Sequence, residues 1–477
     1  MRQRVLEAQL PGWVDPALVF EGLFAAEQNA VWLDSGVHAE RGMSYLGVGS
    51  RPVTASVASG SVTVDGRSSP GTILDFLRVE LAEAIVEPGD GFRLGWVGWL
   101  GYELRAQTMG TTPGQFSRYP DASLLFVDRA IVFDHGHHSV SLMALGTHWD
   151  GDLAVWRDDV SKRMEAAGSA DGYHACRADH ARDCERRGET RGGAGLETRR
   201  NAGAADVTWA YSDLEYLALI RECQAAIVAG DAYQLCLTNE ARVDARPDPL
   251  DTYLRLRASN PSHHGALFRA GALSLLSSSP ELFLSVSPTG AIESKPIKGT
   301  RRRGARPNED ALLAIELESS AKERAENLMI VDLMRNDIGR VSEVGSVSVP
   351  SLLALESYAH VHQLVSTVRG QLARGLDGLD AVAACFPAGS MTGAPKHSAV
   401  AILDRLENRA RGVYSGAFGY FGLDTRIDLS MVIRSIVLDP DGATIGSGGG
   451  ITALSVPEEE LEEVRLKAAA LLAVLRT

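Results

Sequence analysis

Hydrophobic and polar residues divide the chain into two patterned regions with a polar stretch between them. Residues 5–166 carry short apolar or alternating runs separated by glycines, such as AVWLDSG, RLGWVGWLGYEL and SLLFVDRAIVFDH. Such runs predict β-strands mixed with a few helices. Gly95, Gly98 and Gly101 lack the spacing of a dinucleotide fingerprint. They predict a closely packed strand instead.

From Trp209 onward the pattern is denser. The segment SDLEYLALIRECQAAIVAGDAYQLCLTN predicts an amphipathic helix, a Gly-Asp turn and a strand. SSAKERAENLMIVDLMRNDIGRV predicts a helix with Ser319 or Ser320 as its N-cap. SVPEEELEEVRLKAAALLAVL predicts a final helix with Ser455 as its N-cap. Several glycine-bounded apolar runs between these helices predict further strands.

The stretch between the two regions contains almost no large apolar side chain, and it predicts a flexible linker. The expected organisation is an N-terminal subdomain over 1–167, the linker over 168–208 and the main domain over 209–477. The linker carries four candidate metal ligands: His174, Cys176, His180 and Cys184. Their spacing matches no common zinc site, so a plain linker is favoured over a metal site.

Composition and charge narrow the class of protein. The chain has 477 residues, 45% of them hydrophobic, and a formal net charge of −14. This charge argues against a nucleic-acid binder and requires local cations around any anionic substrate. Five irregularly spaced cysteines predict no disulfide framework. Without a signal-like segment or a run of about 18 apolar residues, we expect a cytoplasmic protein that does not contact membranes.

Acidic pairs on two predicted helices are the first candidates for chemistry. Glu326 shares an apolar helical sector with Ile330, and Glu323 lies nearby. A glutamate there is costly to bury without a partner, which is either an arginine or a metal ion. Glu460 and Glu463 on the last helix alone indicate a solvated acidic face. Together, however, the two pairs can supply an oxygen-only site, which suits magnesium.

Three further features are ambiguous on their own. Lys298, in ESKPIKGT, is either a turn lysine facing water or a buried nucleophile. The run GSGGGI, at residues 446–451, can bind an anion through its amides, and a glycine-rich strand bend explains it equally well. Arg434 interrupts the apolar strand MVIRSIV, so it either pairs with an acid or holds a carboxylate in a pocket.

Eight segments in a fixed order resemble the chorismate-utilising enzymes: GDAYQLCLTN, SSSPELFL, PIKGT, AKERAENLMIVDLMRNDIGRV, FPAGSMTGAPK, RGVYSGAFGY, DLSMVIRS and GSGGGI. WLDSG, GWLGYEL and VFDH in the first third are consistent with this resemblance. It implies an α+β fold in which antiparallel β-sheets face each other and helices pack outside. It also implies an enzyme whose active site lies between the facing sheets.

Two positions separate the members of this family, which form anthranilate, aminodeoxychorismate, isochorismate or salicylate. Members that form anthranilate usually have alanine in place of Lys298, whereas lysine is the pattern of the p-aminobenzoate branch that leads to folate. Members that add water have lysine in place of Gln234, and glutamine cannot take a proton from water. The resemblance therefore implies amination of chorismate to aminodeoxychorismate. Anthranilate formation and a non-catalytic chorismate-binding subunit are the alternatives.

The resemblance also implies roles for individual residues. Lys298 attacks ring carbon two of chorismate to give a covalent adduct, and ammonia then adds at carbon four. Because the attacking amine must be neutral, we expect burial and nearby cations to lower the pKa of Lys298. Glu281 matches the acid/base residue for the leaving hydroxyl. The implied substrate-binding residues are Tyr414, Arg434, Lys467, Thr392, Gly448, Gly449, Gly450 and Gln234.

Magnesium is the implied cofactor. Glu326 and Glu463 match its direct ligands, and Glu323 and Glu460 match outer partners. Because the chain has no amidotransferase nucleophile motif, the resemblance implies a separate glutaminase subunit that supplies ammonia.

Two positions depart from the family pattern. Gln363 stands where many members have histidine, with His362 beside it. Asp34 lies in WLDSG, where the feedback-regulated members have L-L-E-S, and this difference argues against tryptophan binding.

Overall fold

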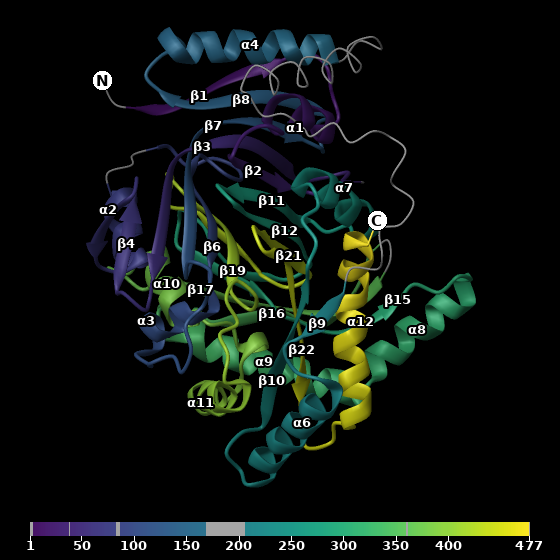
Figure 1. Ribbon diagram of the computed structural model, residues 1–477. Coiled ribbons are helices and arrows are strands. Elements are labelled where there is room, and N and C mark those ends of the chain that lie inside the picture. Colours follow the sequence, from purple (N-terminus) through teal and green to yellow (C-terminus); the bar gives the residue numbers. More distant parts are fainter. Residues whose placement is uncertain (1–2, 38, 83–85, 168–205, 359–360, 477) are drawn as a thin grey trace.

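The computed structural model describes residues 3–37, 39–82, 86–167, 206–358 and 361–476 (Figure 1). The predicted linker therefore lies outside the described residues up to residue 205, together with its four candidate metal ligands. Across the described ranges, no helix is long and apolar enough to span a membrane.

The described strands form one connected sheet of 22 strands, and every pairing in it is antiparallel. The sheet divides at β7 (Ala122–Asp134), which pairs with β3, β6 and β8. A first branch runs from β3 (Met43–Ser56) through β2 (Asn29–Asp34), β11 (His264–Ala270), β12 (Leu273–Ser279), β21 (Ser435–Asp439) and β22 (Gly442–Ile451) to β10 (Gln234–Val243).

A second branch leaves β7 on its other side. It runs from β6 (Gly95–Leu100) through β19 (Ala417–Gly422), β20 (Ile427–Met431), β13 (Leu282–Val286) and β14 (Ala291–Lys295) to β17 (Val361–Gln371), which also pairs with β15 (Ile297–Arg302) and β16 (Ser348–Ser357). Shorter strands complete the sheet: β1 (Arg4–Leu10), β4 (Ser61–Val64), β5 (Arg67–Pro70), β8 (Ser139–Gly146), β9 (Val207–Trp209) and β18 (Gly393–Ala394).

The two branches pack face to face through aromatic side chains. Trp99 of β6 lies edge-on to Phe268 of β11, with ring centroids 5.3 Å apart, and Phe268 contacts Phe418 of β19 at 5.7 Å. All three rings are buried in one apolar cluster. Because the inner faces of both branches are covered in this way, the predicted α+β fold with facing antiparallel sheets is confirmed.

Strand β6 shows why the sequence GWVGWL lacks alternation. All six of its residues are buried, because β7 and β19 flank it and side chains cover both faces. A Cβ atom on Gly98 would lie 1.9 Å from the carbonyl oxygen of Ser123. The predicted close packing at these glycines is therefore confirmed.

The helices lie mostly outside the sheet (Figure 1). Their bounds are α1 (Pro16–Phe24), α2 (Ile73–Ala82), α3 (Arg105–Met109), α4 (Gly151–Ala167), α6 (Asp213–Val228), α7 (Pro249–Ser259), α8 (Pro307–Ser319), α9 (Ala321–Gly339), α10 (Gly378–Cys385), α11 (Lys396–Glu407) and α12 (Pro457–Leu475), with 3₁₀ turns η1 (Tyr102–Leu104) and η2 (Gly389–Met391). Helix α9 packs on β17, and α12 packs on β22. These two helices bring the acidic pairs to the ends of the two branches.

The helix caps test two predictions. Ser320 caps α9 as predicted, since its hydroxyl accepts a hydrogen bond from the Glu323 amide at 3.4 Å. The prediction for α12 is wrong, because Val456 is its N-cap and its side chain makes no capping bond. The Ser455 hydroxyl instead donates to Glu460 Oε1 at 2.7 Å. The Ser455 hydroxyl therefore binds the buried carboxylate of Glu460 and does not cap the helix.

The sheet runs across the predicted domain boundary. Strand β2 pairs with β11, and β6 pairs with β19, so strands from 1–167 bond directly to strands from 209–477. The division of the chain into these two parts stays a prediction from sequence.

Candidate active site

The free ends of the two branches meet at a point marked by Gly450 of β22. A Cβ atom on Gly450 would lie 2.0 Å from Gln234 Nε2 and 3.5 Å from Lys298 Nζ. Gln234 comes from β10 at the end of the first branch, and Lys298 comes from β15 at the end of the second. The fold therefore brings these two predicted residues together, and the absence of a side chain on Gly450 leaves room for both.

Lys298 occupies a β-bulge. Ile297 pairs with Val365 and Thr300 with Gln363, so Lys298 and Gly299 together face a single residue, Leu364, on β17. Gly299 has φ of +87°, which favours glycine. Bulges redirect side chains and are common beside active sites. Because Lys298 lies on strand β15 and its amine lies beside Gly450, the alternative of a plain turn lysine facing water is wrong.

The charge environment of Lys298 differs from the prediction. Burial acts to lower the pKa of the ammonium group, but the neighbouring groups Glu326, Cys236, Glu281 and Glu463 together outweigh it, so its pKa is raised. The expected lowering is wrong because acidic groups, rather than cations, surround the amine. They come from four separate elements: α9, β10, the β12–β13 connection and α12.

Glu281 lies in the short connection between β12 and β13 and is buried. Burial raises the pKa of its carboxyl group to about 7, although hydrogen bonds from Ser390 and the Ile297 amide and the charge of Lys298 oppose this rise. Such a carboxyl can give or take a proton near neutral pH. Ser390, in FPAGSMTG, is a partner that the sequence reasoning missed.

The four glutamates on α9 and α12 do not lie in equivalent surroundings. Burial, with the neighbouring charges of Glu323 and Glu460, raises the pKa of Glu326, while Lys298 and Lys322 oppose the rise. Burial also acts to raise the pKa of Glu463, but Lys467, 2.7 Å away, and nearby lysines outweigh it and lower the pKa. Glu460 is only 3% exposed. The reading of α12 as a solvated acidic face is therefore wrong at Glu460.

The contacts of these four glutamates indicate which of them can bind a metal ion. Glu323 is paired with Arg301 at 3.2 Å, and Glu460 is held by Ser455 and Lys322. The described part of the chain contains no group of three or more acidic, His or Cys ligands. Magnesium commonly binds through one or two carboxylates, several waters and oxygens of the substrate. Glu326 and Glu463 fit that pattern, because both are oxygen donors and negative neighbours already crowd Glu326.

Arg434 has the properties of an anion-binding residue. Its φ is +51°, a strained conformation for a residue other than glycine. Burial lowers the pKa of its guanidinium group. Within the described residues, its side chain makes no recorded hydrogen bond or ion pair. A half-buried guanidinium without a partner among the described residues is suited to bind a carboxylate in two-pronged fashion.

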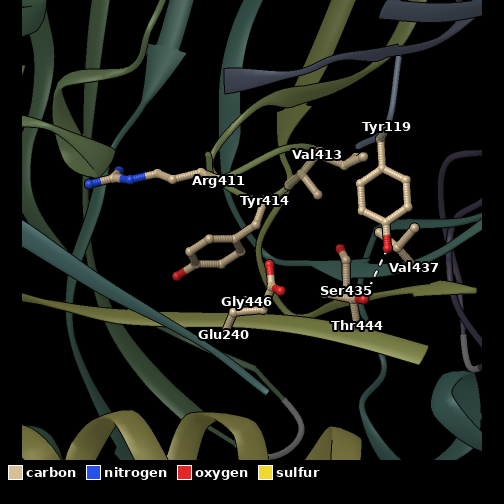
Figure 2. Close-up of a pocket in the computed structure, with 10 residues that line it drawn as sticks. Tyr119, Glu240, Arg411, Val413, Tyr414, Ser435, Val437, Thr444 and Gly446 are labelled. Atoms are coloured by element: carbon tan, nitrogen blue, oxygen red, sulfur yellow. Dashed lines mark hydrogen bonds between the residues drawn. The ribbon is translucent and has the colours of Figure 1, made fainter. Parts of the chain in front are cut away.

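Tyr414 lies in the turn before β19, and it is one of the groups whose charge acts on Arg434. A Cβ atom on Gly446 would lie 2.0 Å from Tyr414 Cγ, so glycine at 446 is what lets the ring lie against the strand. Burial raises the pKa of the Tyr414 hydroxyl well above its ordinary value. The ring also lines a small internal cavity (Figure 2). With about 10 Å³ of space, this cavity holds about one water and is too small for a substrate.

The remaining predicted binding residues are held in place by backbone contacts. Lys467 Nζ donates to the Gly448 carbonyl at 2.8 Å, and Thr392 Oγ1 donates to the Ala388 carbonyl at 3.1 Å. The three glycines Gly448, Gly449 and Gly450 pair with β10. Strand β21 pairs only with residues 442–444 of β22, so these glycines have a described strand on one side only. GSGGGI is therefore a strand with one edge available.

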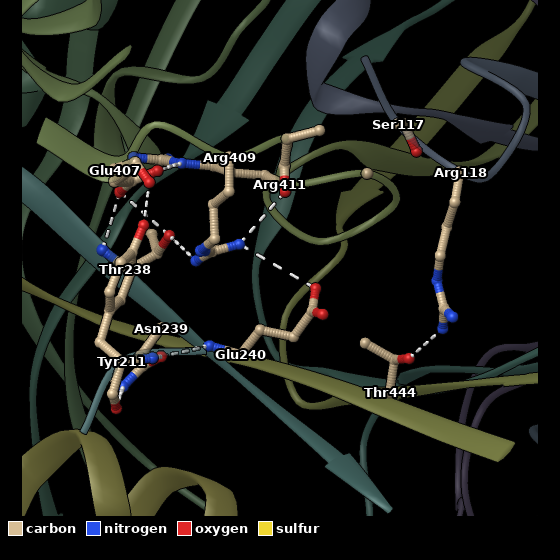
Figure 3. A network of polar contacts seen from close by, with 12 residues as sticks. Ser117, Arg118, Tyr211, Thr238, Asn239, Glu240, Glu407, Arg409, Arg411 and Thr444 are labelled. Atoms are coloured by element: carbon tan, nitrogen blue, oxygen red, sulfur yellow. Dashed lines mark hydrogen bonds and ion pairs between the residues drawn. The ribbon is translucent and has the colours of Figure 1, made fainter. Parts of the chain in front are cut away.

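A buried ion pair fixes the strand and loop that frame the site (Figure 3). Glu407 Oε1 accepts from Arg411 Nη2 at 2.8 Å and from the Thr238 amide at 2.9 Å. Arg411 also donates to the carbonyls of Met391 at 2.7 Å and Cys236 at 2.9 Å. These contacts hold β10 and the 389–392 turn, which carry Gln234 and Thr392. Sequence reasoning missed the pair, although its i, i+4 spacing is a signal.

The two departures from the family pattern have structural explanations. Both ring nitrogens of His362 are used, by Asp310 at 2.9 Å and Ser357 at 2.7 Å, so His362 does not replace the missing family histidine. Asp34 is fixed by Arg257 at 2.6 Å and the Tyr253 hydroxyl at 3.0 Å. Its carboxylate is therefore already committed within the protein.

Comparison with known proteins agrees with this architecture. The model of the chorismate binding enzyme family matches residues 28–473. Aminodeoxychorismate synthases of Streptomyces pristinaespiralis and Streptomyces griseus are 42% identical over 97% and 100% of this chain. The chain spans 64% and 65% of the length of these relatives. Anthranilate synthase component 1 of Streptomyces coelicolor is 34% identical over 97% of this chain and 87% of that protein.

Two solved structures share the fold. Anthranilate synthase component I of Streptococcus pneumoniae has a TM-score of 0.71 at 27% identity and covers 92% of this chain and 94% of its own. The menaquinone-specific isochorismate synthase of Escherichia coli has a TM-score of 0.66 at 16% identity, over 99% of this chain and 94% of its own.

Proposed function

Because the chain belongs to the chorismate binding enzyme family, we propose that it aminates chorismate to 4-amino-4-deoxychorismate, as an aminodeoxychorismate synthase component I. The observation that carries the proposal is Lys298, an amine that a β-bulge aims at Gln234 and Gly450. The 42% identity to aminodeoxychorismate synthases over nearly the whole chain supports it. The product belongs to the p-aminobenzoate branch that leads to folate.

The proposed reaction has two displacements at Lys298. Its nitrogen forms a bond to ring carbon two of chorismate, both ring double bonds shift along the ring toward carbon four, and the 4-hydroxyl leaves as water with a proton from Glu281. Ammonia then adds at carbon four, both double bonds shift back, and the bond from carbon two to Lys298 breaks, with a proton passing from the added nitrogen to the leaving lysine nitrogen. Two displacements thereby place the amine at carbon four.

The first step requires neutral Lys298 and protonated Glu281. If Lys298 starts as an ammonium group and Glu281 as a carboxylate, one proton must pass from the lysine to the glutamate to reach this state. The pKa of Glu281, raised to about 7 by burial, supports such a transfer, because it brings the two groups closer in proton affinity. Gln234 contributes no base at this point, which disfavours addition of water.

Arg434 and Tyr414 are proposed to hold the enolpyruvyl carboxylate, which would give the unpaired guanidinium an anionic partner. Thr392, Lys467 and the amides of Gly448, Gly449 and Gly450 complete the proposed pocket. Glu326 and Glu463 would hold magnesium, with Glu323 and Glu460 outside them. When bound, magnesium would supply positive charge that neutralises the ring carboxylate.

Ammonia is proposed to come from a separate glutaminase subunit. The relatives named component 1 support a second component, since their names imply one. Activity with ammonium salts but not with glutamine is the expected behaviour of the isolated chain.

Anthranilate synthase component I is the second candidate. One observation favours it: this chain spans 87% of the Streptomyces coelicolor anthranilate synthase component 1, against 64% of the first aminodeoxychorismate synthase. Lys298 argues against it.

Product analysis separates the two candidates. The purified chain is incubated with chorismate, magnesium and ammonium at alkaline pH, and products are identified by mass and ultraviolet spectrum. Aminodeoxychorismate from the wild type, and its loss in Lys298→Ala but not in the control Lys295→Ala, would support the proposal. Anthranilate from the wild type would refute it.

A further inference from the structure

Each of the four glutamates on α9 and α12 has a cationic neighbour. The pairs are Glu323 with Arg301 at 3.2 Å, Glu460 with Lys322 at 3.4 Å, Glu463 with Lys467 at 2.7 Å, and Glu326 with Lys298 as its strongest cationic neighbour. Arg301 is shared with Glu316, at 2.6 Å. The four carboxylates are thus largely compensated before any ligand enters, which is an unusual starting point for a site that must attract a dication.

Lys322 differs from the other three cations. It stands on α9, one turn before Glu326, yet its ammonium group contacts Glu460 on α12. It therefore links the two helices that carry the proposed metal ligands. Its side chain is 54% exposed, against 33% for Lys467 and 28% for Arg301. Of these cations, Lys322 therefore loses the least buried surface when its side chain moves into water.

The charges of more than one carboxylate act on Lys322. The charges of Glu460, Glu326 and Glu463 all act to raise its pKa, against the opposing effect of burial. Its electrostatic partners are thus on both helices, and they include both proposed direct ligands of magnesium. Two cations that use the same carboxylates must compete for them.

We propose that Lys322 is an exchangeable counter-ion of the metal site, which neutralises its carboxylates until a divalent cation and the substrate displace it. The inference rests on the magnesium site of the proposed function. It adds a residue that touches neither the ring nor the reacting nitrogen. Lys322 is thus a positioning residue that sets how strongly the dication binds before chorismate arrives.

The charge balance gives the expected effect. Magnesium entering this largely compensated cluster leaves uncompensated positive charge, which the two carboxylates of chorismate can then balance. Without chorismate, the dication therefore binds weakly. Removing the charge of Lys322 leaves one uncompensated carboxylate, and for a dication a few ångströms away this strengthens binding by about tenfold or more at low salt.

Isothermal titration of magnesium into the full chain tests this. In the absence of chorismate, Lys322→Gln is expected to bind magnesium about tenfold more tightly than the wild type, with the difference shrinking at high salt. Lys295→Gln is the matched control, because Lys295 is 43% exposed and also lies 3.4 Å from a glutamate, Glu293, away from this site. Lys295→Gln and the charge-preserving Lys322→Arg are expected to match the wild type.

A second readout does not depend on titration heat. The thermal midpoint of metal-free Lys322→Gln is expected to fall below that of the wild type, because the carboxylates lose their bridging cation. Magnesium is then expected to raise the midpoint of the variant more than that of the wild type. Equal magnesium affinities in wild type and Lys322→Gln would overturn the counter-ion inference and leave the proposed function intact. Failure of the wild type to bind magnesium even with chorismate present would overturn both.

Discussion

Replacing Glu407 with leucine tests how much the buried pair beneath the active site contributes. The carboxylate accepts from Arg411 Nε and Nη2, both at 2.8 Å, and from the amide and hydroxyl of Thr238 at 2.9 and 3.0 Å. Leucine leaves Arg411 buried and unpaired, and it leaves the Thr238 donors without an acceptor. Breaking a buried pair in this way costs about 3–5 kcal/mol, and each orphaned donor adds about 1–3 kcal/mol. We expect a loss of at least about 4 kcal/mol in the free energy of unfolding.

A double-mutant cycle measured by urea unfolding isolates the pair. Because Arg411→Met removes the charge that Glu407→Leu strands, the double variant is expected to be no less stable than Glu407→Leu alone. The coupling energy is then about 3 kcal/mol. The exposed helical pair Asp332–Arg335, at 2.9 Å, is the control, with a coupling below about 0.5 kcal/mol. Additive losses at Glu407 and Arg411 would refute the reasoning.

Three further predictions concern single side chains. The pKa of Glu281 is about 7 in the folded protein against an ordinary 4.5. The folded protein therefore binds this proton more tightly than the unfolded chain does. The resulting stability is fully present below pH 4.5 and is lost as the pH rises through 7. Glu281→Gln should therefore gain thermal stability relative to the wild type between these pH values, and parallel stability profiles would contradict this. Gly446→Ala places a Cβ atom 2.0 Å from Tyr414 Cγ and should raise the KM for chorismate about tenfold or more, whereas the helical control Gly339→Ala should not. Arg434→Met should raise that KM roughly ten- to hundredfold without lowering the unfolding free energy, because the guanidinium has no recorded partner in the described protein; a loss of several kcal/mol in stability would show that Arg434 is structural.

Sequence patterns predicted the structural features that depend only on residues close together in the chain. The strand and helix runs and the Ser320 cap follow from spacing within one segment. The bulge at Lys298 was not predictable, because it exists only in the pairing of β15 with β17, more than 60 residues later. For the same reason the pKa of Lys298 was predicted in the wrong direction, since its acidic neighbours come from elements far apart in the chain.

The spacing of residues along the chain also did not reveal which charged side chains are buried. Glu407 and Arg411 have the separation of an ordinary surface pair on a helix, yet both are 3% exposed. Glu460 has the pattern of an exposed acidic face, yet it takes the hydroxyl of Ser455 and leaves the helix end without a side-chain cap. The deciding contacts are on β10 for the buried pair, and for Glu460 they come from Ser455 in the loop before α12 and from Lys322 on α9.

The pairing of β6 with β19 also has a consequence for synthesis on the ribosome. Strand β6 is apolar on both faces, and the strand that covers one of its edges is made about 320 residues later. At about 5–20 residues per second, that edge stays open for on the order of 15 to 60 s. An open apolar edge is a template for wrong pairing. The nascent first third of the chain is therefore a natural client for chaperones, and the speed of elongation should influence how much folded protein a cell obtains.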